Sequence, residues 1–283
     1  LDAALFCPNE YGMRFIDHFI QLRFLCALLL LTLLASCSTP PTPPEPITLR
    51  VMTYNIHYGR GLDDKVDISR TAEVIKELGA DIVGIQEMDR LTERSGRVDQ
   101  IAELGRLTGM HYYFDKNINF QGGEYGSGLL SRYPMIMKTN THYRMIRPNE
   151  QRGLLQVILD VNGRKVLVMN THLDYRDDHA ERLLNVEEIK AAAERHRDLP
   201  VIMIGDFNMD PGSPAHVRMK DMFVDLWELM GDGPGYTYDG PDRSKRLDYI
   251  FIRPSIHLEP LRIFLTNAVA SDHRPVTADI LLK

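Results

Sequence analysis

The feature that most constrains the fold of this chain is a series of short apolar runs that each carry acidic, amide or imidazole side chains at one end. Short runs rich in β-branched residues are typical of buried β-strands. The polar ends, one of them at a strand start, are Thr53-Tyr54-Asn55, Ile85-Gln86-Glu87, Asn170-Thr171-His172-Leu173, Gly205-Asp206-Phe207-Asn208, Arg246-Leu247-Asp248-Tyr249 and Ser271-Asp272-His273-Arg274-Pro275. A single such end is typical of a turn or a structural histidine. Their recurrence indicates one polar site shared by several strand ends.

Strands and helices alternate along the body of the chain, and strands dominate. Asp67 is expected to cap a helix that closes at Gly79, with apolar residues at helical spacing between them. Further helices are expected at 99–107 and 178–196, and strands at 48–56, 81–87, 112–114, 127–131, 154–161, 165–170, 201–205, 247–252, 256–265 and 277–281. Many of these strands come as hairpins. We therefore expect residues 47–283 to form one α/β domain of the α+β type, with two mainly antiparallel β-sheets packed face to face and helices outside.

The first 46 residues are expected to be a targeting and anchoring segment rather than part of that domain. The apolar run at 24–35 follows arginines and is too short to span a bilayer comfortably, which is typical of a secretory signal. It leads into Leu-Ala-Ser and Cys37, which resembles a bacterial lipobox. We expect residues 1–36 to be a signal peptide and Cys37 to be lipidated. The alternatives are an ordinary cleaved signal with an incidental cysteine, or a buried helix.

The segment after Cys37 indicates where the domain is held. Residues 38–46 are rich in proline, which predicts a semi-rigid tether. The residue after Cys37 is Ser38 rather than an acidic residue, which resembles lipoproteins sorted to the outer membrane of Gram-negative bacteria. We expect the domain to face the periplasm. The chain does not begin with Met, and a start at Met13 would give a normal signal peptide. We therefore expect residues 1–12 to result from a mis-assigned gene start.

Composition narrows the possible chemistry. All three cysteines lie within the first 37 residues, so the body has no disulfide framework and no cysteine zinc site. The 33 Lys+Arg residues against 39 Asp+Glu, a formal charge of −6, argue against a tight binder of duplex DNA. Oxygen and imidazole ligands without thiolates suit a hard divalent cation such as Mg²⁺ or Mn²⁺.

Taken in order, the six polar segments resemble the endonuclease/exonuclease/phosphatase superfamily over residues 48–283. The resemblance implies a four-layered α/β sandwich with its site at one end. It also implies a metal-dependent hydrolase that acts on phosphoric ester bonds by in-line attack of water.

The resemblance assigns roles to the acidic and amide side chains. Glu87 is expected to bind the metal ion, with Asn55 and Asp272 as further ligands. Asp206 and Asn208 match an Asp-x-Asn pair that orients or deprotonates the attacking water and touches the phosphate.

The resemblance also assigns the histidines. His172 and His273 are expected to contact the phosphate, and Asp248 to hold the ring of His273. Glu124 is a candidate partner for His172, with a solvated surface glutamate as the alternative reading.

Three loop segments bear on the substrate. Residues 55–61, 94–100 and 120–126 look like a bacterial hydrolase subgroup similar to the phosphodiesterase-like domain of proteins that remodel glycosylphosphatidylinositol lipids. Candidate substrate-binding residues are Tyr125, Arg94, Arg97, Asp99 and, in the basic run 243–246, Arg246. Ordinary surface loops are the alternative for these arginines.

We therefore expect a monomeric phosphodiester hydrolase of the cell envelope, acting on small or lipid-linked substrates, with the membrane reached through its anchor. Scattered rather than clustered basic residues do not favour nucleic acid as the partner. A secreted or surface-anchored nuclease is the enzymatic alternative. A catalytically inert binding lipoprotein is the other.

Overall fold

A computed structural model describes residues 45–239 and 244–283. Within these ranges no helix is both long and apolar enough to cross a membrane. The expected signal peptide, Cys37 and most of the tether lie outside the described residues, as does Arg243 of the basic run. Residues 46–283 form one compact unit.

The first sheet has six strands in the order β13-β14-β1-β2-β4-β3. Its strands are β1 (Ile47–Asn55), β2 (Ile82–Arg90), β3 (His111–Phe120), β4 (Gly123–Ser131), β13 (Leu258–Leu265) and β14 (Val276–Leu282). β1 and β2 are parallel, joined by α2 (Ile68–Leu78), and every other pair is antiparallel. The parallel pair brings the carboxyl ends of β1 and β2 to the same edge.

The second sheet has six strands in the order β5-β6-β7-β8-β12-β9. Its strands are β5 (Met135–His142), β6 (Gly153–Val161), β7 (Arg164–His172), β8 (Val201–Asp206), β9 (Val224–Asp225) and β12 (Asp248–Ile252). Here β7 and β8 are the parallel pair, joined by α4 (Ala180–Glu194). A small separate ribbon pairs β10 (Tyr238–Asp239) with β11 (Ser244–Lys245).

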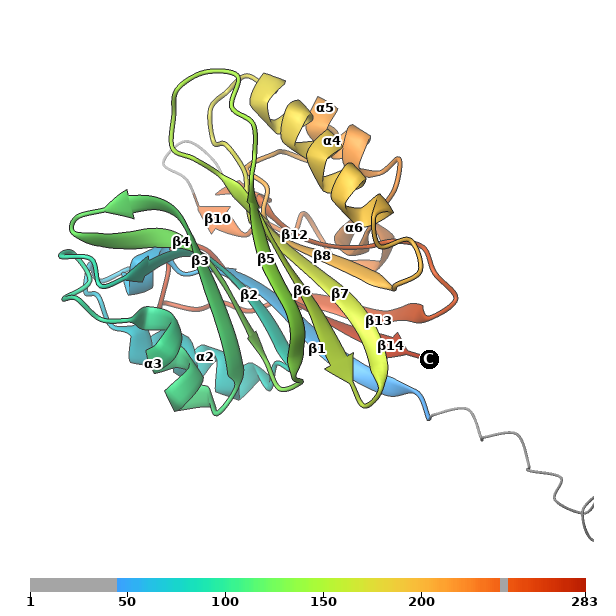
Figure 1. Ribbon diagram of the computed structural model, residues 1–283, viewed down its shortest axis with the longest axis horizontal. Helices are drawn as coiled ribbons and strands as arrows, with labels where there is room; N and C mark the ends of the chain where they lie inside the picture. The colour runs from blue at the N-terminus through green and yellow to red at the C-terminus, as the bar shows by residue number, and fades with distance from the viewer. Residues whose placement is uncertain (1–44, 240–243) are drawn as a thin grey trace, which may run out of the picture. The chain divides into compact units, whose positions relative to one another are not determined.

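The two large sheets face each other, and helices cover their outer sides (Figure 1). Aliphatic side chains from both sheets, such as Val51 and Val168, fill the space between them. α2 and α3 (Gln100–Thr108) pack on the first sheet through a second apolar cluster, and α4 and α5 (Pro214–Met219) pack on the second sheet through a third. The short elements η1 (His57–Gly59) and α6 (Leu226–Met230) complete the described set. The expected sandwich of two β-sheets with helices outside is confirmed, and its helices are few compared with its strands.

One glycine sets how closely the sheets approach near their polar ends. A Cβ added to Gly84 of β2 would lie 2.5 Å from the Cδ1 atom of Ile204 and 3.0 Å from the Cγ atom of Asn170, both on the opposite sheet. Only glycine allows this approach without displacing a neighbour. At this point β2 therefore lies close against β7 and β8 of the opposite sheet.

Candidate active site

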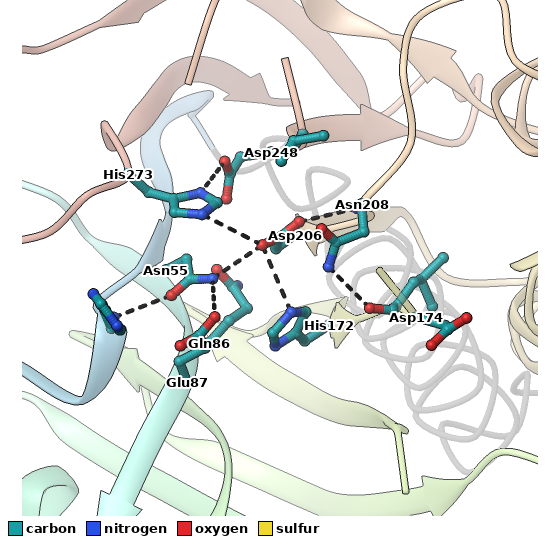
Figure 2. A network of polar contacts seen from close by, with 12 residues as sticks. Asn55, Gln86, Glu87, His172, Asp174, Asp206, Asn208, Asp248 and His273 are labelled. Atoms are coloured by element: carbon teal, nitrogen blue, oxygen red, sulfur yellow. Dashed lines mark hydrogen bonds and ion pairs between the residues drawn. The ribbon is translucent and has the colours of Figure 1, made fainter. Parts of the chain in front are cut away.

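The polar side chains predicted from the sequence meet at one end of the sandwich (Figure 2). Asn55 ends β1, His172 ends β7 and Asp206 ends β8. Asp248, the first residue of β12, lies directly opposite Asp206 in the antiparallel register. The two parallel strand pairs explain this convergence, because each pair ends at the same edge of its sheet.

A bulge in β2 directs Glu87 toward this site. The register between β2 and β4 shifts between Ile85 and Met88, and Glu87 has a φ of +54°. Such a backbone is uncommon for a residue other than glycine and often marks a functional position. The preceding residue, Gln86, is buried and donates to Asn170 Oδ1 at 2.6 Å. The bulge thus leaves the Gln86 amide between the sheets and directs the Glu87 carboxylate into the site.

Asn55 joins two of the predicted carboxylates. Its Nδ2 atom donates to Glu87 Oε1 and to Asp206 Oδ2, both at 2.9 Å. Two acceptors of one nitrogen at normal hydrogen-bond length lie within about 6 Å of each other. The imidazole Nε2 atoms of His172 and His273 lie 3.7 and 3.9 Å from the same Asp206 oxygen. Asp206 is therefore the centre of the arrangement.

The environment of Asp206 changes its acidity. Burial raises the pKa of its carboxyl and the Asp248 charge raises it further, while His273 and Asn55 oppose the shift, which leaves a pKa of about 7. A carboxylate with a pKa near neutrality is suited to take a proton from water.

The neighbouring Asn208 lies with Asp206 on one tight turn. Its backbone N–H donates to Asp206 Oδ1 at 2.9 Å, and its Nδ2 donates to the Leu173 carbonyl at 3.0 Å. Asn208 has a φ of +46° and lines the cavity described below. The Asp-x-Asn spacing thus fixes the orientation of the Asp206 carboxylate.

His273 is held by a buried carboxylate. Its Nδ1 atom lies 2.8 Å from Asp248 Oδ2, and its backbone N–H donates to the Ser271 hydroxyl at 3.2 Å. Burial alone would lower the pKa of His273, but the charges of Asp248, Asp206 and Asp272 raise it to about 10. The ring is therefore an imidazolium at neutral pH, with its Nε2–H directed toward Asp206.

His172 is held in the opposite protonation state. Arg152 Nη1 lies 2.9 Å from His172 Nδ1, and both side chains are buried. A guanidinium cannot accept a hydrogen bond, so Nδ1 is the acceptor and Nε2 carries the proton. Burial lowers the pKa of His172 well below its ordinary value, and the Arg152 and His273 charges lower it further. The ring is a neutral donor whose Nε2–H points into the site.

The expected pairing of His172 with Glu124 is wrong. Glu124 lies on β4 and forms ion pairs with Arg90 and, at 3.3 Å, with Lys116. Arg152 stands beside His172 instead because β6 is antiparallel to β7, which sets the residue before β6 next to the end of β7.

Glu87 and Asp272 are the carboxylates that fit a divalent cation. Both line the cavity, and among the described residues Glu87 accepts one side-chain hydrogen bond, from Asn55. Asp272 Oδ2 lies 3.4 Å from His57 Nδ1. One or two carboxylates that leave room for water are the usual protein ligands of Mg²⁺. Asn55 does not fit the predicted ligand role, because its nitrogen faces the carboxylates and its Oδ1 accepts the His57 N–H at 3.1 Å.

Two other groups of side chains lie close enough to share an ion: Asp206, Asp248 and His273, and His216, Asp225 and Glu228. In each group a histidine is already paired with an aspartate, since His273 Nδ1 lies 2.8 Å from Asp248 Oδ2. His216 accepts the Gly212 N–H at Nδ1 and contacts Asp225 through Nε2 at 2.9 Å.

Arg246, a predicted substrate-binding residue, instead pairs with Asp225 at 2.9 Å and stacks on Tyr249. Arg246 is therefore buried away from the cavity, and its predicted contact with substrate is wrong.

A cavity of about 470 Å³ opens over these side chains. Its lining combines the site residues with a ring of aromatic and charged side chains: Glu87, Arg94, Ile118, Phe120, Tyr125, Glu150, Arg152, His172, Tyr175, Asp206, Asn208, Tyr238, Lys245, Leu247, Asp272 and His273. Arg94 and Tyr125, two of the predicted substrate-binding residues, both line this cavity. Arg97 is exposed and does not line the cavity, and Asp99 instead caps α3.

The sequence reasoning missed Glu150, Arg152 and Tyr238. The available signal for the first two was their place just before a strand that forms a hairpin with the His172 strand. Tyr238 bridges to His273 in antiparallel pairing, and its ring lies 4.9 Å from the imidazole. No pattern in the sequence indicates that contact.

Comparisons with known proteins agree with this geometry. The Endonuclease/Exonuclease/phosphatase family matches residues 52–273. The uncharacterized protein YbhP of Escherichia coli (strain K12) is 24% identical over 258 residues, which cover 86% of this chain and 100% of that protein. Tyrosyl-DNA phosphodiesterase 2 of Bos taurus is 29% identical over 144 residues, covering 47% and 38% of the two chains. The solved structure of a mannosyl-6-phosphatase from Bacteroides thetaiotaomicron has the same fold, with a TM-score of 0.66, 19% identity and coverage of 82% and 99%.

Proposed function

Because this chain belongs to the endonuclease/exonuclease/phosphatase family, whose members hydrolyse phosphoester bonds, we propose that it is a divalent-metal-dependent hydrolase of small or lipid-linked phosphodiesters in the cell envelope. The observation that carries the proposal is the position of Asp206. Its carboxylate, with a pKa of about 7, lies between a neutral and a charged imidazole and is tied to Glu87 through Asn55.

Each side chain then has a chemical task. Asp206 draws a proton from the water that attacks phosphorus. His172 and His273 donate from Nε2 to the phosphate oxygens, where negative charge builds up in the transition state. Asp248 and Arg152 hold the two rings so that these protons stay directed at the substrate.

Glu87 and Asp272 would hold the cation, Mg²⁺ or Mn²⁺. When bound, it supplies positive charge that offsets the phosphate anion.

The charges around the cavity favour a small substrate over a nucleic acid strand. Arg94 is paired with Asp89 at 2.7 Å, and Arg152 with Glu150 at 2.7 Å. Strand-binding grooves instead offer rows of available Lys and Arg with stacking aromatic residues. The nuclease alternative is kept because part of the chain is similar to tyrosyl-DNA phosphodiesterase 2.

Placement in the envelope follows from the sequence signals at 24–46. A lipidated Cys37 and a proline-rich tether would hold a monomer at a membrane surface, where lipid headgroups are the nearby phosphodiesters.

A substrate panel tests the proposal. The full chain is assayed with Mg²⁺ on bis-p-nitrophenyl phosphate, on phosphatidylinositol or sphingomyelin vesicles, and on plasmid DNA at physiological salt. We expect turnover of the small ester and of a lipid. Strong plasmid nicking without lipid turnover would establish the nuclease instead. An Asp206→Asn/His273→Ala double variant with unchanged turnover would refute the catalytic assignment.

A further inference from the structure

One wall of the cavity carries polar groups that the hydrolytic chemistry does not use. Tyr125 of β4 lines the cavity and is largely buried, with 8% of the residue exposed. Its hydroxyl has no hydrogen-bond partner among the described residues. A tyrosine in a largely buried position usually finds a partner for its hydroxyl, so this unpaired hydroxyl is available to a ligand in the cavity. Burial and the charges of Glu87 and Glu150 raise its pKa well above the ordinary value, so it remains a donor.

The Arg94 guanidinium lies over the ring of Tyr125 and is held rigidly. Arg94 donates from Nε and Nη2 to the buried Asp89 at 2.7 and 2.9 Å. Its guanidinium carbon lies 3.8 Å from the Tyr58 ring centre, 4.6 Å from that of Phe120 and 5.4 Å from that of Tyr125. Asp89 and the rings fix its position. Its Nη1 is without a partner among the described residues, which leaves one more donor on this wall.

Glu150 supplies an acceptor. One carboxylate oxygen pairs with Arg152 at 2.7 Å, the side chain is 28% exposed, and Glu150 lines the cavity. The wall therefore offers donors from Tyr125 and Arg94 and an acceptor from Glu150, beside the apolar side chain of Ile118.

The charges on this wall cancel. Asp89 neutralises Arg94, and Glu150 neutralises Arg152. Lys245 of β11 also lines the cavity and has no ion pair among the described residues. It lies opposite Tyr238 in the β10–β11 ribbon, and Tyr238 pairs with His273. Lys245 is therefore on the side of the reacting phosphate. A second phosphate bound at Tyr125 would meet no unpaired cation, and the Glu150 carboxylate would repel it.

We propose that Tyr125, Arg94 and Glu150 form a subsite for the alcohol part of the ester, and that it selects an uncharged group bearing several hydroxyls over one that carries another phosphate. An alcohol both donates and accepts, which matches the mixed donors and acceptor of this wall. The subsite rests on the proposed phosphodiester hydrolysis and names its substrate class.

A matched pair of substrates tests the subsite. Glycerophosphoinositol has one phosphate and a hydroxylated ring, and glycerophosphoinositol 4-phosphate adds a second phosphate to the same scaffold. Bis-p-nitrophenyl phosphate, which carries no hydroxyls, reports the reacting site alone. The variant is Tyr125→Phe in the full chain, and the matched control is Tyr112→Phe, on β3 outside the cavity lining and 46% exposed.

We expect kcat/KM to be higher for glycerophosphoinositol than for its 4-phosphate. Tyr125→Phe should lower kcat/KM for glycerophosphoinositol about three- to tenfold, mainly through KM, which is the loss of one neutral hydrogen bond. Turnover of bis-p-nitrophenyl phosphate, which carries no hydroxyl for Tyr125 to bind, should fall by a clearly smaller factor, and the control should match the wild type on all three substrates.

Four results would overturn the subsite. They are a preference for the 4-phosphate, no turnover of either glycerol ester while bis-p-nitrophenyl phosphate is hydrolysed, no effect of Tyr125→Phe on glycerophosphoinositol, and an equal loss on all three substrates. If the wild-type chain hydrolyses none of the three, including bis-p-nitrophenyl phosphate, the proposed function itself fails and the subsite with it.

Discussion

Asp206 shows how one residue gains reactivity from its neighbours. It is buried at the end of β8, faces Asp248 across the strand pair, and is touched by one amide and two imidazoles. Burial opposes ionisation and nearby positive charge favours it. The balance sets a pKa of about 7, which an exposed aspartate would not have.

This balance predicts the pH dependence of the reaction. Asp206 must be deprotonated to accept a proton, so kcat/KM for bis-p-nitrophenyl phosphate should rise as pH increases through about 7 and fall below it. A profile measured from pH 5 to 9 checks this. A flat profile across that range would show that another group accepts the proton.

Arg152 predicts a fixed tautomer for His172. ¹⁵N spectra of histidine-labelled protein at pH 7 should show a neutral His172 ring protonated at Nε2. Arg152→Met removes the donor to Nδ1, so the two tautomers should mix and kcat should fall about tenfold, the loss of one strong hydrogen bond. Arg152→Lys should restore part of both signals.

Arg152→Met also leaves Glu150 unpaired, which could destabilise the fold. Thermal denaturation of the variant therefore distinguishes the loss of the His172 tautomer from unfolding. A His172 ring that is already charged or protonated at Nδ1 in the wild type would contradict the assignment.

The site residues differ in how far they could be predicted. Glu87, Asp206 and His273 lie in recognisable segments, so their shared site is predicted from the sequence, although the structure places Glu87 at a bulge within β2 and His273 just before β14. Arg152 belongs to no such segment and depends on the register of β6 against β7. Arg246 lies in a basic run, but the buried Asp225 captures it, and composition gives no sign of that.

Among the elements, local signals predict the helices best. Asp67 caps α2 by accepting from the Ser69 N–H at 2.9 Å, and Gly79 ends it with a φ of +63°, both as expected. β5 was not predicted, because Met135–His142 lies at a sheet edge and mixes polar and apolar residues without a clear alternation. The bulge in β2 that directs Glu87 was likewise invisible, since it arises from pairing with β4.

Gly84 of β2 allows a test of how the sheets are held together. In Gly84→Ala the new methyl group would meet Ile204 and Asn170, so the variant should lose about 1–3 kcal/mol of unfolding free energy. Urea denaturation measures this. Adding Ile204→Val removes the Cδ1 atom that the methyl group meets, so the double variant should lose less than the sum of the two single variants.

A Gly84→Ala variant as stable as the wild type, or two losses that simply add, would show that the sheets are not in close contact at this point.

In the molecule as a whole, the two parallel strand pairs are what gather distant segments into one site. The sequence indicates two sheets through its many hairpins, but not which strands neighbour each other. Strand order depends on contacts between residues far apart in the chain, such as Asn55 with Asp206, which local propensity does not encode.

The N-terminal signals give a prediction for the location of the full chain. We expect the wild type in the membrane fraction of cells and a Cys37→Ser variant in the soluble fraction, because the lipid anchor would be lost. Immunoblots of both fractions measure this. A wild-type protein found in the soluble fraction would refute the anchor and leave the hydrolase assignment intact.

The most direct test of the site is a Mg²⁺ titration of bis-p-nitrophenyl phosphate hydrolysis by the wild type, by Glu87→Gln and by the control Glu124→Gln, whose carboxylate pairs with Arg90 and Lys116 instead. We predict that chelation abolishes wild-type turnover and Mg²⁺ restores it. Loss of an outer-shell partner alone costs about 10- to 100-fold, so Glu87→Gln, which changes a direct ligand, should require at least about 10-fold more Mg²⁺ or lose activity by a similar factor, while Glu124→Gln titrates like the wild type. Turnover that persists without a divalent cation, or a Glu87→Gln variant that titrates like the wild type, would contradict the proposed site.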